Sequence, residues 1–121
     1  MLNKRHNDSH ACVYSIPCKD CTDIYIGETG KSLEVRLKQH QSAYNRADEN
    51  NAMFIHAWNE NHRIDWKNAK VIIKCDNAER RKILEAMEIK QNNTFNLQKS
   101  PIDLEPTTWK LLYKLLNNKM L

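Results

Sequence analysis

The segment from Val13 to Gly30 constrains the fold of this 121-residue chain more than any other stretch. It contains two short apolar runs, at 13–16 and 24–27, and each run carries a tyrosine. Pro17 ends the first run, because proline has no N–H to donate to a sheet. The connection between the runs is short, so we expect them to pair as an antiparallel hairpin.

Apolar residues recur at helical or alternating spacing along the rest of the chain. This spacing predicts helices at about 32–46, 51–61 and 77–92, a further helix after Pro106 and Thr107, and a third strand over 67–75. The sequence therefore predicts an α/β fold: a small three-stranded antiparallel sheet flanked by helices, with an added helix at the C-terminus.

The same patterns predict which residues cap the helices and which face the core. We expect Ser32 to cap the first helix, and Asp76 with Glu79 to form a capping box at the third. The last strand is expected to face the core with Ala69, Val71, Ile73 and Cys75. The third helix is expected to face it with Ile83, Leu84 and Met87. The last helix is expected to carry an apolar stripe of Trp109, Leu112, Tyr113 and Leu116.

Composition and charge limit the class of protein without identifying a partner. No apolar run approaches the length that spans a bilayer, and the polar start of the chain lacks the apolar segment of a signal peptide. We therefore expect an intracellular protein with no membrane partner, in which the 4 cysteines are thiols or metal ligands rather than disulfides. The net charge of +4 permits a polyanionic partner but does not establish one.

Tyr14 and Tyr25 are the first candidates for chemistry. A tyrosine on a strand is by default a packed residue with its hydroxyl at the surface. Two tyrosines on paired strands near one edge are more informative, since both hydroxyls are able to converge on one point. Gly27, which follows Tyr25-Ile26, indicates that a backbone segment or a ligand approaches closely there.

These residues are part of a longer ordered pattern. Val13-Tyr14 followed by Tyr25-Ile26-Gly27 resembles the signature of the GIY-YIG endonucleases, although Cys12 stands where those enzymes usually carry glycine. The later residues that match the family pattern are Arg36 and His40, one turn apart on the next helix, Glu85 in the segment LEAMEIK, and Asn96 after Thr94-Phe95. The resemblance extends over about residues 11–97 and implies a GIY-YIG nuclease core that hydrolyses phosphodiester bonds in DNA.

The resemblance implies a catalytic metal ion and a phosphate-binding group. Glu85 is a hard oxygen ligand suited to one Mg²⁺ or Mn²⁺. Glu88 competes for this role, because residues three apart share one side of a helix. Arg36 is suited to bind the scissile phosphate through two hydrogen bonds.

Proton transfer is the role implied for the aromatic members of the pattern. Tyr14 is the expected general base or water-positioning hydroxyl, with Tyr25 and His40 orienting it or moving protons. Whether Tyr14 or His40 is the base stays open at this point. Asn96 completes the expected catalytic set.

A second constellation has the residue types of a zinc site. Cys18 and Cys21 are separated by two residues, and His56 and His62 by five, which suits a tetrahedral two-cysteine, two-histidine Zn²⁺ site. Such an ion would be structural, tying the loop of the hairpin to the second helix. A redox-active cysteine pair and an ordinary surface histidine are the competing interpretations.

The cysteine pair also narrows the resemblance. Ser15-Ile16-Pro17-Cys18 with Cys21, followed by the run at 25–32, resembles the endonuclease domain of Penelope-like retroelements. This resemblance implies nuclear DNA as substrate, nicking of one strand to prime reverse transcription, and a reverse transcriptase domain in the same polyprotein. It divides the chain into a flexible leader at 1–10, a nuclease core with a zinc staple at 11–97, and a C-terminal helical extension at 98–121.

Two other interpretations remain open. The second interpretation is a zinc-stapled nucleic-acid-binding module without catalysis, which contacts phosphates through clusters such as Lys4-Arg5 and Arg80-Arg81-Lys82. The chain also matches a GIY-YIG repair or homing nuclease whose thiol pair is incidental. The target sequence, the choice of DNA over RNA and the oligomeric state are not predicted.

Overall fold

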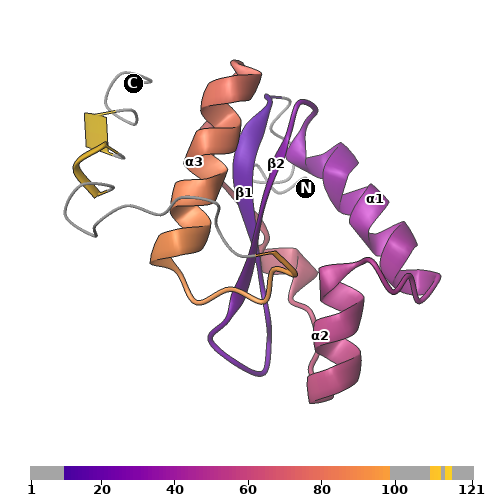
Figure 1. Cartoon of the computed structure of the whole chain (residues 1–121). Helices are drawn as coiled ribbons and strands as arrows, with labels where there is room; N and C mark the ends of the chain where they lie inside the picture. The colour runs from indigo at the N-terminus through magenta and orange to yellow at the C-terminus, as the bar shows by residue number, and fades with distance from the viewer. Residues whose placement is uncertain (1–9, 99–109, 113, 116–121) are drawn as a thin grey trace.

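The computed structural model of the chain describes residues 10–98, 110–112 and 114–115. In chain order the elements are β1 (Cys12–Pro17), β2 (Ile24–Thr29), α1 (Leu33–Asn45), α2 (Ala52–Glu60), the short 3-10 helix η1 (Trp66–Asn68), β3 (Lys70–Lys74) and α3 (Ala78–Gln91). Figure 1 labels β1, β2, α1, α2 and α3. Residues 110–112 and 114–115 are helical. The predicted α/β fold is therefore confirmed. Residues 1–9 of the predicted leader and three members of the predicted C-terminal stripe, Trp109, Tyr113 and Leu116, lie outside the described residues.

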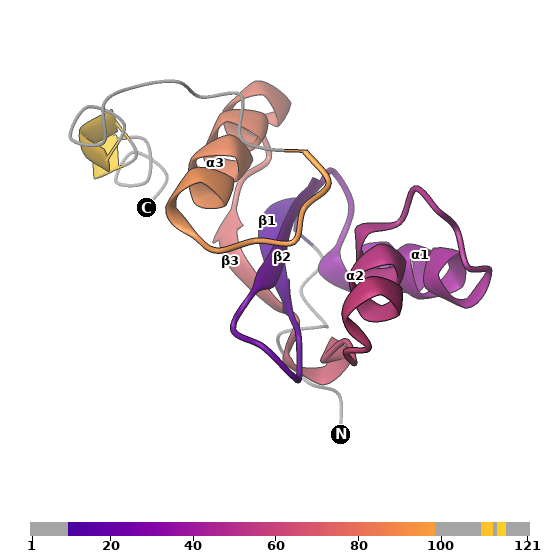
Figure 2. The ribbon, with the colours of Figure 1, turned by 60° about the horizontal axis from the view of Figure 1, so that its bottom comes forward.

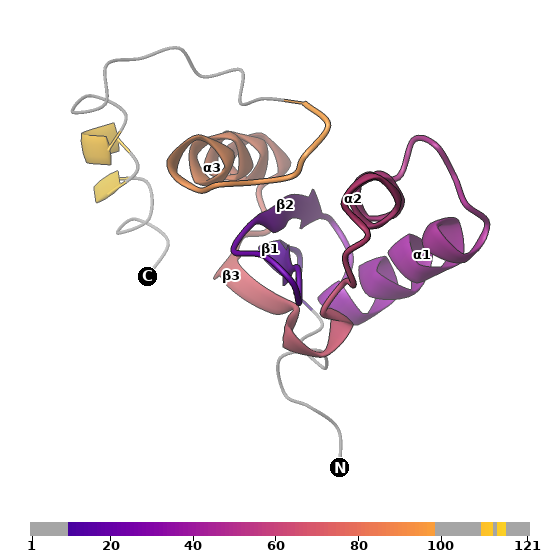
Figure 3. The same ribbon diagram turned by 90° about the horizontal axis from the view of Figure 1, so that it is seen from below.

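The sheet has β1 at its centre, with the strand order β2-β1-β3 and antiparallel pairing on both sides. Figures 2 and 3 show α3 on one face of the sheet and α1 and α2 on the other. Side chains of β1 alternate between the two faces. Tyr14 and Ile16 pack with Leu33 and Met53 on the α1 and α2 side, while Val13 packs with Leu84 on the α3 side.

The third strand is irregular where it pairs with β1. Val13 is opposite Ile73, but the next residue, Tyr14, is opposite Val71, so Ile72 is an extra residue in β3. A bulge of this kind reverses the direction of the side chains that follow it. The prediction that Val71 and Ile73 share one side is therefore wrong. Val71 packs on the α1 and α2 side of the sheet with Tyr14, and Ile73 packs on the α3 side with Val13.

Short polar side chains fix where the helices begin. The Ser32 hydroxyl accepts a hydrogen bond from the Val35 N–H at 3.2 Å, so its predicted cap is confirmed. The cap of α3 is Asn77, which accepts from the Arg80 N–H at 2.9 Å. The prediction of Asp76 is wrong by one residue, because asparagine caps a helix as well as aspartate does.

Only part of the predicted core face of α3 is buried. Leu84 and Met87 are fully buried against the sheet, as expected. Ile83 is 44% exposed, so its predicted core position is wrong. Residue 83 lies about 100° around the helix from residue 84, which turns it away from the face that packs on the sheet.

The segment after α3 covers the outer edge of β2. The Ile24 N–H donates to the Asn93 carbonyl and the Phe95 N–H donates to the Ile24 carbonyl, both at 3.0 Å. Covering a sheet edge satisfies backbone groups that would otherwise be open to other chains. Among the described residues, no helix has the length and apolar character required to cross a membrane.

Candidate functional site

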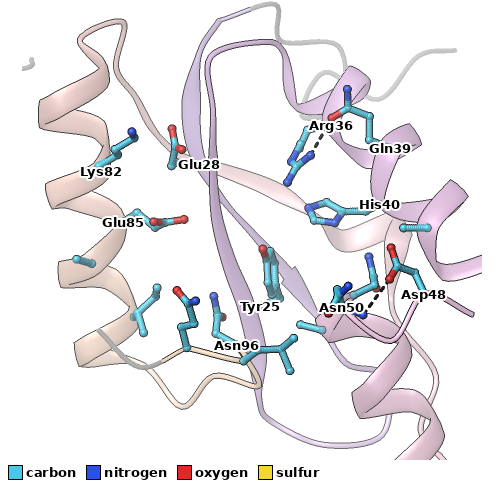
Figure 4. A pocket seen from close by; sticks show the side chains of 17 residues that line it. Tyr25, Glu28, Arg36, Gln39, His40, Asp48, Asn50, Lys82, Glu85 and Asn96 are labelled. Carbon is cyan, nitrogen blue, oxygen red and sulfur yellow. Dashed lines mark hydrogen bonds between the residues drawn. The ribbon is translucent and has the colours of Figure 1, made fainter. Parts of the chain in front are cut away.

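A cleft of about 620 Å³ opens between α3 and the α1–α2 pair, with β2 between them (Figure 4). Five of the six predicted catalytic side chains line it: Tyr25, Arg36, His40, Glu85 and Asn96. They come from β2, α1, α3 and the segment after α3, and so from positions 25 to 96 of the chain. The fold thus brings together residues that are far apart in the sequence.

Tyr14 lies beneath the cleft rather than in its lining. Its side chain is 0% exposed, and its hydroxyl makes a 2.7 Å hydrogen bond with Nε2 of His40. Burial, assisted by the nearby Tyr25, raises the pKa of Tyr14 far above its ordinary value. Burial and the Arg36 charge lower the pKa of His40 to about 4, so its imidazole is neutral at pH 7. The hydrogen bond therefore joins two neutral groups.

Tyr25 occupies the centre of the site. Its ring lies 5.3 Å from the His40 ring and 6.3 Å from the Tyr14 ring, measured between centroids. Burial raises the pKa of Tyr25, although the Arg36 charge opposes this effect. Both tyrosine hydroxyls are therefore protonated at neutral pH, because the low-dielectric surroundings disfavour the phenolate.

Arg36 and Glu85 face each other across the cleft, one from α1 and one from α3 (Figure 4). The guanidinium of Arg36 donates to Gln39 at 2.9 Å through Nη1. Its Nε is buried and has no hydrogen-bond partner among the described residues. Because Nε is out of reach from the cleft, an acceptor such as a phosphate oxygen would bind the outer nitrogens of this guanidinium, which lines the cleft.

Glu85 is the carboxylate that α3 presents to the cleft. Burial, followed by the neighbouring Glu28, raises its pKa to about 7. Glu88, the competing candidate, is buried elsewhere: its carboxylate accepts hydrogen bonds from Gln91 at 3.0 Å and Asn92 at 3.3 Å. The structure therefore places Glu85 in the cleft, whereas Glu88 is not among its lining side chains.

Asn96 is attached to the backbone of the second tyrosine strand. Its Oδ1 accepts from the Ile26 N–H at 2.9 Å, and its Nδ2 donates to the Ile26 carbonyl at 2.7 Å. The side-chain amide thus acts like one residue of a neighbouring strand. This contact fixes the position of β2 between Tyr25 and Gly27, so Asn96 supports the site structurally as well as lining it.

The predicted zinc ligands converge at the other end of the hairpin. One donor atom from each of Cys18, Cys21, His56 and His62 lies within 4.8 Å of the others. The Cys18 sulfur is 3.5 Å from His62 Nδ1, the Cys21 sulfur is 3.5 Å from His56 Nε2, and the two nitrogens are 3.2 Å apart.

These distances fit a single tetrahedral metal site. With zinc–sulfur bonds of about 2.3 Å and zinc–nitrogen bonds of about 2.0–2.1 Å, a tetrahedron has sulfur–nitrogen edges of about 3.5 Å and a nitrogen–nitrogen edge of about 3.3 Å. Burial and the neighbouring His62 lower the pKa of His56, which favours the neutral imidazole that a metal requires. The chemistry and the spacing of the donors therefore both suit Zn²⁺.

Neighbouring residues hold the cysteine–histidine cluster in place. The Asp20 carboxylate accepts two hydrogen bonds from the Arg63 guanidinium, at 2.9 and 3.2 Å, and a third from the Arg63 N–H at 2.8 Å. The ring of Phe95 stacks on His56 at 4.3 Å. Such outer contacts orient metal ligands before an ion is bound.

Comparison with protein families settles the relationship. The family model described as the GIY-YIG catalytic domain matches residues 10–99. The chain belongs to the GIY-YIG family. Its members are metal-dependent nucleases that act on DNA, so this is a nuclease domain by descent. Curated proteins and solved structures, in contrast, give no match to this chain.

The sequence pattern missed two charged residues of the GIY-YIG site. Glu28, the residue after the motif glycine, lines the cleft, and Arg81 donates to it at 2.6 Å. Arg81 was expected in a basic cluster for phosphate contacts, but it is buried, so that part of the prediction is wrong. The spacing on α3 was the signal that could have placed Arg81 near the cleft. Arg81 is four residues before Glu85, so the two share one face of the helix.

The sequence predicts that a ligand or a backbone segment approaches Gly27. In the structure a side chain does so instead. Tyr14 is the partner of Gly27 across the hairpin, and a Cβ at Gly27 would collide with the Tyr14 hydroxyl. We expect Gly27→Ala to destabilise the domain by about 1–3 kcal/mol, since the buried ring has little room to move. Gly30→Ala is the matched control, because its Cβ would lie 3.4 Å from the nearest atom, in Arg81. Chemical denaturation measures both, and equal stability losses would contradict this explanation.

The titration of His40 is also predictable. The His40 signals in an NMR titration should move at about pH 4, because burial is the main cause of the low pKa and the Arg36 charge adds to it. Folding favours the neutral form, so His40 stabilises the domain above about pH 6.5 and this contribution is lost as the pH falls towards 4. Arg36→Met should raise the pKa of His40 but leave it below 6.5, because burial remains. A wild-type midpoint between pH 6 and 7 would show that His40 is solvated.

Proposed function

We propose that this domain is an endonuclease that hydrolyses one strand of DNA with the help of a Mg²⁺ or Mn²⁺ ion at Glu85. The observation that carries the proposal is the placement of Arg36 and Glu85 on opposite walls of one cleft, with Tyr25 between them. A phosphodiester in this cleft would meet a cation on one side and an oxygen ligand for a metal on the other.

Each side chain has a role that follows from its surroundings. Arg36 binds the scissile phosphate through the guanidinium that it presents to the cleft. Tyr25, the tyrosine that reaches the cleft, orients the attacking water by its hydroxyl. Tyr14 and His40 hold Tyr25 in place through the buried hydrogen bond between them. Asn96 keeps β2 in register with the cleft.

The site suits a hard divalent cation. Glu85 is half-buried at the cleft and offers carboxylate oxygens, which Mg²⁺ and Mn²⁺ prefer, and the remaining space admits several water ligands. When bound, such an ion lowers the pKa of a water ligand and neutralises charge on the phosphate. This contribution explains how a site without a strong protein base is able to activate water.

We propose Zn²⁺ as a structural ion at Cys18, Cys21, His56 and His62. Its position between the hairpin loop and α2 supports this role, since the four ligands leave no coordination site open for substrate. The histidines follow the cysteine pair by more than thirty positions of the chain, which agrees with a staple inside one domain rather than a separate finger.

The cysteine pair between the two tyrosine strands also supports a finer proposal. We infer a relationship to the endonucleases of Penelope-like retroelements, in which the nick in nuclear DNA supplies the 3′ end for a reverse transcriptase of the same polyprotein. In that proposal residues 11–97 are the nuclease core, 1–10 a leader and 98–121 an extension. The spatial convergence of the cysteines with His56 and His62 is the supporting observation.

The test is nicking of supercoiled plasmid by the zinc-loaded protein in Mg²⁺ or Mn²⁺. Arg36→Lys should lower the rate by about a hundredfold, because lysine offers a point charge in place of a two-pronged donor. Arg46→Lys, on the exposed end of α1, is the matched control and should stay within about twofold of the wild type. DNA binding without cleavage in any divalent ion would favour the non-catalytic binding module instead.

A further inference from the structure

A second carboxylate stands beside Glu85 in the cleft. Glu28 directly follows Gly27 on β2 and lines the same cleft, and Figure 4 shows its side chain on the Glu85 side of the site. The two carboxylates therefore reach the same part of the cleft from different elements, Glu28 from β2 and Glu85 from α3. Neither the pattern of motif residues nor the family match assigns a role to Glu28.

Arg81 holds the Glu28 carboxylate in a fixed position. Its Nε donates to Glu28 Oε1 at 2.6 Å, and its Nη1 donates to the carbonyl of Cys75 at 3.1 Å. The Arg81 side chain is 8% exposed, so this hydrogen-bonded pair is largely shielded from water. Charge-assisted hydrogen bonds in such surroundings are strong and directional.

The arrangement leaves one carboxylate oxygen available. Arg81 uses Oε1 of Glu28, while Oε2 has no hydrogen-bond partner among the residues that the structure describes. Arg81 pairs with Glu28, whereas the cations that act on Glu85 are Lys82 and Arg36. A divalent cation that binds the free Oε2 of Glu28 and the Glu85 carboxylate together would turn the repulsion between these two groups into a shared attraction.

A purely structural ion pair would not require this geometry. An Arg–Glu pair that only ties α3 to β2 gains nothing from presenting a free oxygen to the cleft, and buried ion pairs contribute little stability by themselves. The i, i+4 spacing of Arg81 and Glu85 on α3 instead places the arginine so that it fixes Glu28 next to Glu85.

We propose that Glu28 is a second carboxylate ligand of the divalent cation at Glu85, and that Arg81 positions it. The inference rests on the proposed function, because it concerns the same cation. It assigns Glu28 to metal binding and Arg81 to the orientation of that ligand.

The experiment measures Mn²⁺ binding to the zinc-loaded full chain by isothermal titration calorimetry, and by the loss of the free Mn²⁺ signal in electron paramagnetic resonance. Glu28→Gln keeps an acceptor for Arg81 but removes the charge. We expect it to weaken Mn²⁺ binding by about tenfold or more, with nicking partly restored at high Mn²⁺. Glu79→Gln is the matched control, because Glu79 is exposed in the first turn of α3, the helix that carries Glu85. This variant should bind Mn²⁺ like the wild type.

The outcomes separate this inference from the proposed function. If Glu85→Gln abolishes Mn²⁺ binding and Glu28→Gln leaves it within twofold of the wild type, Glu28 is not a ligand and the inference fails alone. If the wild type binds no Mn²⁺ and cuts no plasmid, both proposals fail. Thermal unfolding of Glu28→Gln checks its fold, and Glu28→Asp, which keeps the charge, should regain part of the Mn²⁺ affinity if charge is what matters.

Discussion

Glu85→Gln is expected to reduce plasmid nicking by about a thousandfold or more while leaving the fold and the zinc content unchanged. The substitution keeps the size and the hydrogen-bonding shape of the side chain, but it removes the charged oxygen ligand that faces Arg36 across the cleft. It also removes a carboxyl group whose pKa is raised to about 7, so the variant should be at least as stable as the wild type.

Glu88→Gln is the matched control for this prediction. Glu88 is on the same helix and was the competing candidate, but its carboxylate is occupied by Gln91 and Asn92. We expect its nicking rate to stay within about threefold of the wild type, with a small loss of stability. Full activity of Glu85→Gln, or inactivation by Glu88→Gln alone, would overturn the assignment of the metal ligand.

Cys18→Ser is expected to abolish zinc binding and to lower the melting temperature by about 10 °C or more. A structural zinc ion contributes its binding free energy to folding, and the loss of one thiolate removes most of it. With about 4–8 °C per kcal/mol for a domain of this size, the expected shift corresponds to a few kcal/mol. Zinc content by mass spectrometry and differential scanning calorimetry provide the two measurements.

Cys75→Ser is the matched control for the zinc site. Cys75 is also a buried thiol, but its sulfur donates to the Asn77 carbonyl at 3.4 Å and is not part of the cluster. The variant should keep one zinc per chain and show only the modest loss of a packed sulfur. If Cys18→Ser keeps both its zinc and its stability, the cysteine pair has another role and the repair or homing nuclease becomes the better interpretation.

Local features of this fold were predictable because local chemistry determines them. Ser32 begins α1 through its own side chain, and the hairpin forms because Pro17 ends one strand a few residues before the next begins. The bulge at Ile72 was not predictable, since alternating apolar residues look the same whether or not one residue is skipped. Its position depends on pairing with β1, which is distant in sequence.

The site shows the same division. Residue types and spacing were sufficient to select four side chains that lie together, because few other combinations offer two sulfurs and two nitrogens to one ion. Tyr14 is buried because its face of β1 packs against α1. Arg81 is buried where α3 packs on the sheet and hydrogen-bonds Glu28 of β2. Contacts between elements decide both, and the order of the sequence does not display them.

The consecutive residues Phe95 and Asn96 give the two sites a shared dependence. Phe95 stacks on His56, a proposed zinc ligand, and Asn96 is hydrogen-bonded to the backbone of Ile26 beside the motif tyrosine. A fluctuation that detaches this short segment would release both contacts together. The rate of hydrogen exchange at the Ile26 amide therefore measures how firmly the nuclease strand is held, and it should rise when zinc is withdrawn at the opposite end of the hairpin.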